Sequence, residues 1–182
     1  MPITNAADID NTFIGKGIVK FMKADDVAGT YRDLGEVPEF EYTATVDKLD
    51  YFSSRSGIRT KARSVIRERS ANLRMVMSEL TADNLALYLM GEATAAVPPD
   101  ETYTIDIFSL SEIVGALRFV GTNDVGAKVQ LDFGNVSFTP SASFNPISEE
   151  WGQLEVTAEI LVDDTGKYGT AIWNITAEVT TP

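Results

Sequence analysis

The chain has 182 residues, and its 15 Lys and Arg side chains are outnumbered by 27 Asp and Glu, which gives a formal net charge of −12. Histidine and cysteine are absent, which excludes a histidine general base, a cysteine nucleophile, His or Cys metal ligands and disulfide bonds. The acidic balance argues against a general nucleic-acid binder, because such proteins hold phosphates with Lys and Arg, and no apolar run approaches the ~18 residues of a membrane span.

The first part of the chain alternates polar connections with strand-like segments. Residues 1–13 are polar, so we expect an N-terminal arm there, and they lack the charged and apolar regions of a signal peptide. Residues 17–22 indicate a strand, and residues 31–37 a short strand that Pro38 ends. Residues 40–46 alternate apolar and polar side chains, a pattern typical of a half-buried strand.

Residues 47–60 break this alternation with a polar segment rich in Ser and Arg. The segment is longer than an ordinary hairpin connection, and loops of that length are commonly functional, so we expect a long loop. After it, residues 61–69 indicate a strand that places its odd-numbered residues from Arg63 to Arg69 on one face. Residues 73–77 indicate a second strand.

One helix is predicted at about residues 82–90. Thr81 is a favourable N-cap, and the negative charge of Asp83 suits the first turn of a helix. Apolar side chains then fall on one face at spacings of three and four. Gly91 supplies a left-handed stop, and residues 93–99 follow as a linker of small residues and prolines.

The second half of the chain indicates strands almost throughout. They are expected at residues 103–107, 117–121, 129–138 with a bulge or turn near Gly134, 154–162 and 171–179. The last two strands flank a turn and predict a hairpin. A chain of this length buries one full core, so we expect a single domain over residues 1–182. The predicted class is mainly β (α+β), an antiparallel β-sandwich or barrel with one flanking helix.

The charge is unevenly distributed along the chain. Residues 51–80 hold seven basic and two acidic side chains, whereas residues 1–50 carry a net charge of −5 and residues 81–182 a net charge of −12. One interpretation is a solvated basic face. The other is a contact surface for an acidic neighbour, for which a copy of the same protein is the nearest candidate, because complementary patches direct association.

No motif points to catalysis, a cofactor or a metal ion. Gly15-Lys16-Gly17 lacks the third glycine of a dinucleotide fingerprint and precedes a strand instead of following one. The acidic pairs at 149–150 and 163–164 lie in predicted turns without calcium-loop spacing. We therefore expect a protein that is not an enzyme. Hydrolysis by a pair of carboxylates stays open, but no feature locates such a pair.

The run from Lys48 to Lys61 contains Leu49, Tyr51, Ser53, Ser54 and Gly57. It resembles the "L-x-Y-x-S-S-x-x-G" region of the tail tube proteins of long-tailed bacteriophages (siphophages). The order that follows is similar as well, with a strand pair, the segment 79–86 and then strands to the end. The resemblance covers about residues 36–92, and the rest agrees in length and strand pattern.

The resemblance implies a β-sandwich core with a helix at its flank, a fold shared with the tubes of contractile tails and type VI secretion systems. Copies form rings, usually of six, whose inner strands line a channel, and the rings stack into a tube. It implies a non-enzymatic virion component that is present in the host cytoplasm during assembly. The implied partners are its own copies, the tape-measure protein, tail-tip or distal tail proteins and the tail terminator, with DNA passing through the channel without specific binding.

The resemblance also implies where the copies meet. In the family the long loop reaches the adjacent ring, which maps onto residues 47–60, and terminal arms bridge neighbours, which suits residues 1–13. The candidate interface residues are Asp47, Lys48, Asp50, Tyr51, Arg55, Arg59, Lys61 and Arg63. Glu39 and Glu41 are candidates for an acidic channel wall.

The alternative function is a monomeric β-sandwich module that binds a ligand such as a carbohydrate. Such a module requires an exposed aromatic platform. Only Trp151 and Trp173 are available for it, and the alternation places Trp173 on a buried face.

Overall fold

The computed structural model describes residues 12–27, 29–55, 57–96 and 102–179. Most of the predicted N-terminal arm, residues 1–11, lies outside the described residues. The elements in chain order are β1 (Gly17–Lys23), β2 (Arg32–Asp33), β3 (Glu39–Ser53), β4 (Thr60–Met77), α1 (Ala82–Leu89), β5 (Ala93–Ala95), β6 (Tyr103–Ile105), β7 (Ile113–Gly121), β8 (Val129–Pro140), β9 (Leu154–Ile160) and β10 (Thr170–Trp173). The expected mainly β class with a single flanking helix is confirmed for these residues.

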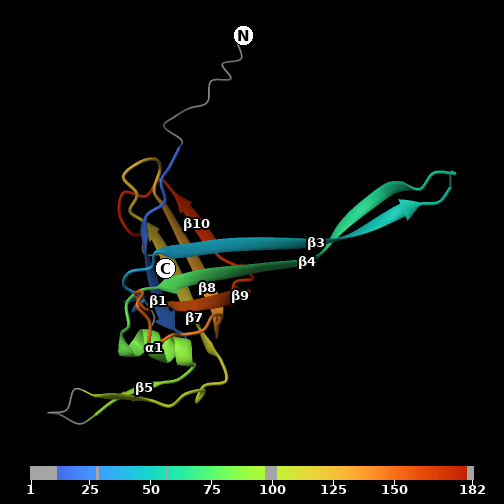
Figure 1. Ribbon diagram of the computed structural model, residues 1–182. Helices are drawn as coiled ribbons and strands as arrows, with labels where there is room; N and C mark the ends of the chain where they lie inside the picture. Colours follow the sequence, from blue (N-terminus) through green and yellow to red (C-terminus); the bar gives the residue numbers. More distant parts are fainter. Residues whose placement is uncertain (1–11, 28, 56, 97–101, 180–182) are drawn as a thin grey trace.

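Eight strands form one antiparallel sheet in the order β2-β1-β7-β8-β9-β4-β3, and β10 pairs with β8. Figure 1 shows β3, β4 and β9 running across β1, β7 and β8, so the sheet folds over on itself. The ring of Phe40 in β3 stacks on Phe119 in β7 with 5.4 Å between centroids, although these strands are far apart in the sheet order. The core therefore lies between two halves of one sheet.

The core is built from the apolar faces of both halves. Phe21 and Phe138 meet edge to face at 4.9 Å, and Leu73, Met75 and Leu117 are fully buried beside them. The strands of this body alternate buried and accessible residues, as β9 does along its whole length, because successive side chains point to opposite faces.

Helix α1 covers one end of the core and begins as the sequence predicts. The Asn84 N–H donates to Thr81 Oγ1 at 3.1 Å, so the N-cap is confirmed. The helix ends one residue earlier than expected, because Met90 and not Gly91 adopts the left-handed conformation (φ 52°). Gly91 serves a different purpose, since a Cβ there would lie 2.5 Å from the carbonyl oxygen of Asp106.

The bulge predicted near Gly134 is confirmed. Gly115 pairs with Val136 and Leu117 with Phe133, so β8 carries one more residue than β7 at this point. Strand β8 continues through the bulge, which explains why its buried positions change phase.

The predicted hairpin between residues 154–162 and 171–179 is wrong. Strand β9 lies between β8 and β4 and has no free edge, so β10 pairs with β8 instead. Only residues 170–173 of this region form a strand. In the linker expected at 93–99, residues 93–95 form β5, which pairs with β6, and residues 97–99 lie outside the described residues.

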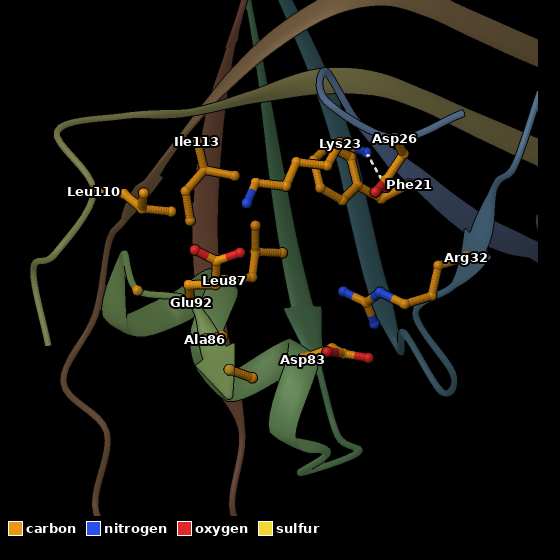
Figure 2. Close-up of a pocket in the computed structure, with 12 residues that line it drawn as sticks. Phe21, Lys23, Asp26, Arg32, Asp83, Ala86, Leu87, Glu92, Leu110 and Ile113 are labelled. Carbon is orange, nitrogen blue, oxygen red and sulfur yellow. Dashed lines mark hydrogen bonds between the residues drawn. The ribbon is translucent and has the colours of Figure 1, made fainter. Parts of the chain in front are cut away.

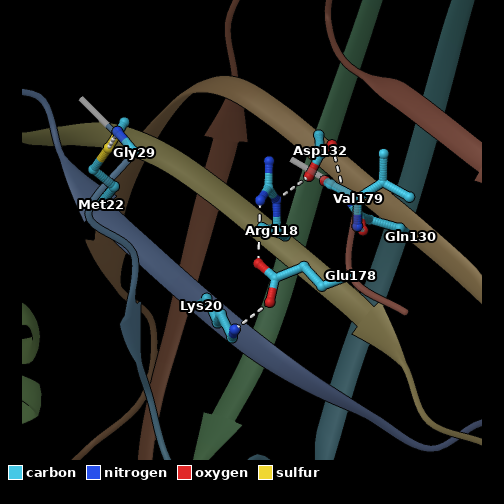
Figure 3. A network of polar contacts seen from close by, with 8 residues as sticks. All are labelled: Lys20, Met22, Gly29, Arg118, Gln130, Asp132, Glu178 and Val179. Carbon is cyan, nitrogen blue, oxygen red and sulfur yellow. Dashed lines mark hydrogen bonds and ion pairs between the residues drawn. The ribbon is translucent and has the colours of Figure 1, made fainter. Parts of the chain in front are cut away.

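Side chains hold the chain after β10 against β1, β7 and β8 (Figure 3). Glu178 accepts a bond from Arg118 at 3.1 Å and from Lys20 at 2.5 Å. The Gln130 side chain makes two hydrogen bonds to the backbone of Val179, at 2.7 and 2.8 Å. Arg118 and Gln130 are buried, and their polar groups are satisfied by this segment together with Asp132 of β8.

Candidate interaction surface

Strands β3 and β4 form a long hairpin that projects from the body (Figure 1). The two strands pair from Glu39–Val76 out to Ser53–Thr60, but β4 pairs with β9 only over Asn72–Met77. We call residues 44–55 and 57–71 the projecting hairpin, because no third strand of the described chain lies beside them. Ten residues of β3 extend about 33 Å at the usual rise of a strand.

The long loop predicted at 47–60 is therefore corrected to the end of a strand pair, and strands 61–69 and 73–77 are one strand. Only residues 54–59 connect β3 to β4. Two register shifts insert an extra residue in β4, Arg67 and Ala62. These bulges interrupt the period of two within β4 and increase the local twist. In β3, which has no inserted residue, the alternation stops because both faces of residues 47–53 are accessible and neither is purely apolar.

Apolar side chains are exposed on both faces of the projecting hairpin. On one face Leu49 (62% exposed) lies opposite Val65, next to Tyr51 (67% exposed). On the other face lie Val46 and Ile66. A lone two-stranded ribbon is at best marginally stable in water, and clustered exposed apolar side chains indicate an interaction surface.

The predicted single face from Arg63 to Arg69 is wrong. Arg63 lies opposite Tyr51, whereas Arg69 lies opposite Val46. Tyr51 and Val46 are five residues apart on a strand without an inserted residue, so they face opposite sides. The bulge at Arg67 thus divides the basic side chains between both faces of the hairpin.

The projecting hairpin is rich in basic side chains. It holds seven basic and three acidic residues, whereas the rest of the chain holds eight basic and 24 acidic ones. Lys61 lies 2.7 Å from Asp50, and Ser64 Oγ donates to the same carboxylate at 2.6 Å. The bonds from Lys61 and Ser64 hold the pKa of Asp50 below its ordinary value.

All eight predicted interface residues lie on the hairpin. Asp47, Lys48, Asp50 and Tyr51 belong to β3, Arg55 and Arg59 to the connection, and Lys61 and Arg63 to β4. The guanidinium of Arg59 lies 5.4 Å from the centre of the Phe52 ring. Sequence reasoning missed the apolar members Leu49, Val65 and Ile66. Leu49 falls in the predicted loop, which assigns no faces, and the strand predicted at 61–69 is interpreted by its basic face.

The base of the hairpin is fixed to the body by aromatic and ionic contacts. Tyr42 stacks on Phe133 at 5.9 Å, and the Tyr168 hydroxyl donates to the Arg69 carbonyl at 3.1 Å. Arg74 binds Glu39 at 2.7 Å and Glu155 at 3.0 Å, and lies 3.8 Å from Glu41. The bonds to Glu155 and Glu39 raise the pKa of Arg74, and the bond from Arg74 lowers the pKa of Glu155. Glu39 and Glu41, the two candidates for the channel wall, therefore lie beside the same cation, Arg74.

A hollow of about 300 Å³ lies between β1 and α1 (Figure 2). Its floor is apolar, with Phe21, Leu87 and Ile113, and its rim is charged. No group of three Asp or Glu side chains in the described ranges is arranged to hold a metal ion, and none of the helices described there could cross a membrane.

Trp151 (95% exposed) and Trp173 (67% exposed) are both accessible, so the predicted burial of Trp173 is wrong. Trp173 lies opposite Val129, where β8 begins. Trp151 precedes β9, whose Val156 lies opposite Pro140, where β8 ends. The two indoles are thus at opposite ends of β8 and form no common aromatic platform.

The geometry defines a class of protein, a mainly β body that carries one long basic hairpin. The chain belongs to the family described as protein of unknown function UCP028589, whose profile matches residues 12–104. The matched region contains β1 to β5, most of β6, the projecting hairpin and α1.

Two solved structures are similar over most of the chain. One is described as the tail of an empty GTA particle with C6 symmetry (16% identity, TM-score 0.41, covering 79% of this chain and 89% of that chain). The other is the virion of a native gene transfer agent (GTA) particle (13% identity, TM-score 0.37, covering 79% and 88%). No curated protein matches the chain significantly.

Proposed function

We propose that the chain is a structural subunit of a bacteriophage tail tube of the siphophage type. Copies associate into rings of six, and the rings stack into a tube that encloses the tape-measure protein and conducts DNA during ejection. The observation that carries the proposal is the projecting hairpin, about 33 Å of paired strand with exposed apolar side chains on both faces. The resemblance of residues 48–61 to the tail tube motif supports the same function.

The shape of the chain favours repeated contacts between copies. The hairpin extends away from its own body (Figure 1), and β3 is an edge strand along its whole length. Open edges invite pairing with another chain. A basic hairpin that contacts an acidic body is a heterologous contact, and such contacts generate rings when they close and stacked assemblies when they do not.

The remaining partners follow from the same function. Residues 1–182 act as one tail-tube domain, with residues 1–13 as an arm between neighbours. The ends of the tube contact the tail-tip or distal tail proteins and the tail terminator. DNA passes without specific binding, because an acidic wall offers no cations to phosphates. The subunit is a virion component, present in the host cytoplasm during assembly, with no enzymatic role and no insertion in membranes.

Electron microscopy of the purified protein over a range of salt concentrations tests the proposal. We expect rings or hollow tubes, and their loss in the Arg55→Glu/Arg59→Glu variant, because hairpin charges direct the contact. The matched control Lys128→Glu/Lys167→Glu makes the same change in net charge outside the hairpin and retains assembly. Monomers of the wild type at all concentrations, with and without a tail-tip complex, would contradict the proposal.

A further inference from the structure

Six carboxylates gather around the α1 end of the body. They come from the β1–β2 turn, from β2 and the segment after it, and from the two ends of α1: Asp26, Asp33, Glu36, Glu79, Asp83 and Glu92. None of them takes part in an ion pair within the described part of the chain. The hollow beside them is lined by three of these carboxylates, Asp26, Asp83 and Glu92, and by two cations, Lys23 and Arg32.

Three of these carboxylates surround the hollow between β1 and α1, which we call the α1 cleft. Figure 2 shows Asp83 and Glu92 on the α1 side and Asp26 on the β1 side. Below them, Phe21, Leu87 and Ile113 form an apolar floor. Arg32 Nη1 donates to Asn84 Oδ1 at 2.6 Å, and the charge of Arg32 interacts with Asp83, Asp26 and Asp33.

The projecting hairpin has the complementary composition. Its net charge is +4, and Lys48, Arg55, Arg63 and Arg69 take part in no ion pair with a described residue. Its exposed apolar side chains, Leu49 and Tyr51 among them, match the apolar floor. Complementary charge around an apolar centre is the usual anatomy of a specific protein contact.

We propose that the α1 cleft is the acceptor site for the projecting hairpin of a second copy of this chain. A copy cannot fill its own cleft, because its hairpin extends away from the side of the body that carries α1 (Figure 1). The hairpin and the cleft are different surfaces, so each copy offers one of each and the contact propagates. This inference rests on the proposed function, since it names the partner surface of the same hairpin.

A basic β-ribbon could also bind a nucleic acid, which is negatively charged as the α1 cleft is. The exposed apolar side chains of the hairpin and the 24 acidic residues of the rest of the chain favour a protein partner. Binding of the purified protein to a double-stranded DNA oligonucleotide, with cleft variants assembling as the wild type does, would overturn the inference in favour of nucleic acid.

The first experiment reverses the cleft charges with Asp83→Lys/Glu92→Lys and measures assembly by sedimentation. We expect the concentration needed for assembly to rise at least about tenfold, because like charges then face each other. Combination with Arg55→Glu/Arg59→Glu should restore assembly. The control Glu149→Lys/Glu150→Lys alters an exposed loop and should assemble as the wild type does. Melting temperatures identify a variant that fails to fold, and the neutral variant Asp83→Asn/Glu92→Gln then replaces it.

The second experiment uses the absence of native cysteine. Arg59→Cys and Glu92→Cys are made in separate chains, mixed under assembly conditions and oxidised, and a disulfide-linked heterodimer is expected. Arg59→Cys mixed with Glu150→Cys should give none. If the wild type fails to assemble, the proposed function and the inference both fall. If it assembles but cleft reversal and cross-linking have no effect, only the inference falls.

Discussion

The body and the projecting hairpin use the same backbone pairing and differ in what covers their side chains. In the body, β9 buries alternate residues completely, and the buried polar groups of Arg118 and Gln130 are bonded to neighbouring segments. In the hairpin, residues 60–69 are all exposed. Burial drives folding, so the body accounts for the stability of the subunit. The hairpin has its apolar and charged side chains available for contacts between copies.

The largest expected effect on stability separates the two regions directly. Phe138→Ala removes a side chain that is 1% exposed and packs against Phe21. We expect it to lower the free energy of unfolding by about 3–5 kcal/mol, measured by denaturant unfolding of the monomeric subunit. Tyr51→Ala on the hairpin should change it by no more than about 0.5 kcal/mol and impair assembly instead. Equal losses of stability in Phe138→Ala and Tyr51→Ala would contradict this division between a body that stabilises the subunit and a hairpin that contacts other copies.

A smaller effect is expected where the C-terminal segment contacts the body. Glu178→Gln weakens the bonds from Lys20 and Arg118 and should cost about 1–2 kcal/mol. Lys20, first, and Arg118 hold the pKa of Glu178 below its ordinary value. The folded state therefore binds fewer protons than the unfolded state, and stability is lost as the pH falls through the folded pKa. The melting temperature of the wild type should drop more steeply below about pH 4 than that of Glu178→Gln; parallel profiles would exclude this role.

Removal of the helix cap should lower the free energy of unfolding by about 1 kcal/mol. Thr81→Ala deletes the acceptor for the Asn84 N–H, and caps of this kind contribute about that much. Thr45→Ala changes the same residue type on the exposed hairpin and serves as the control. Urea unfolding should resolve the two, and equal midpoints would show that the cap contributes nothing.

The smallest effect should come from the ion pair on the hairpin itself. Lys61→Ala breaks the contact with Asp50, which is exposed to solvent, and exposed ion pairs contribute little to stability. We expect an unchanged melting temperature of the isolated subunit and a shift in the salt dependence of assembly. A clear fall in the melting temperature would mean that the hairpin is part of the folding unit.

Local signals in the sequence predict those structural features that depend on neighbouring residues. The cap at Thr81 and the bulge near Gly134 were both found because each depends on near neighbours. The pairing of β10 with β8 cannot be predicted from neighbouring residues, because it depends on β9 having a strand at each of its two edges. The outer part of β3 resembles a loop in the sequence because both of its faces are accessible and carry mixed polar and apolar side chains, whereas the bulges at Ala62 and Arg67 disturb the period of two in β4. Trp173 follows the alternation of a buried strand, but nothing in the described chain covers it.

Deletion of the hairpin tests the central claim most directly. Residues 47–68 are replaced by Asn-Gly, a two-residue turn that joins the paired residues Val46 and Arg69. We predict a variant that melts at the temperature of the wild type and forms neither rings nor tubes under the electron microscope at any salt concentration. A folded variant that assembles as the wild type does would contradict the account, because the copies would then meet through another surface.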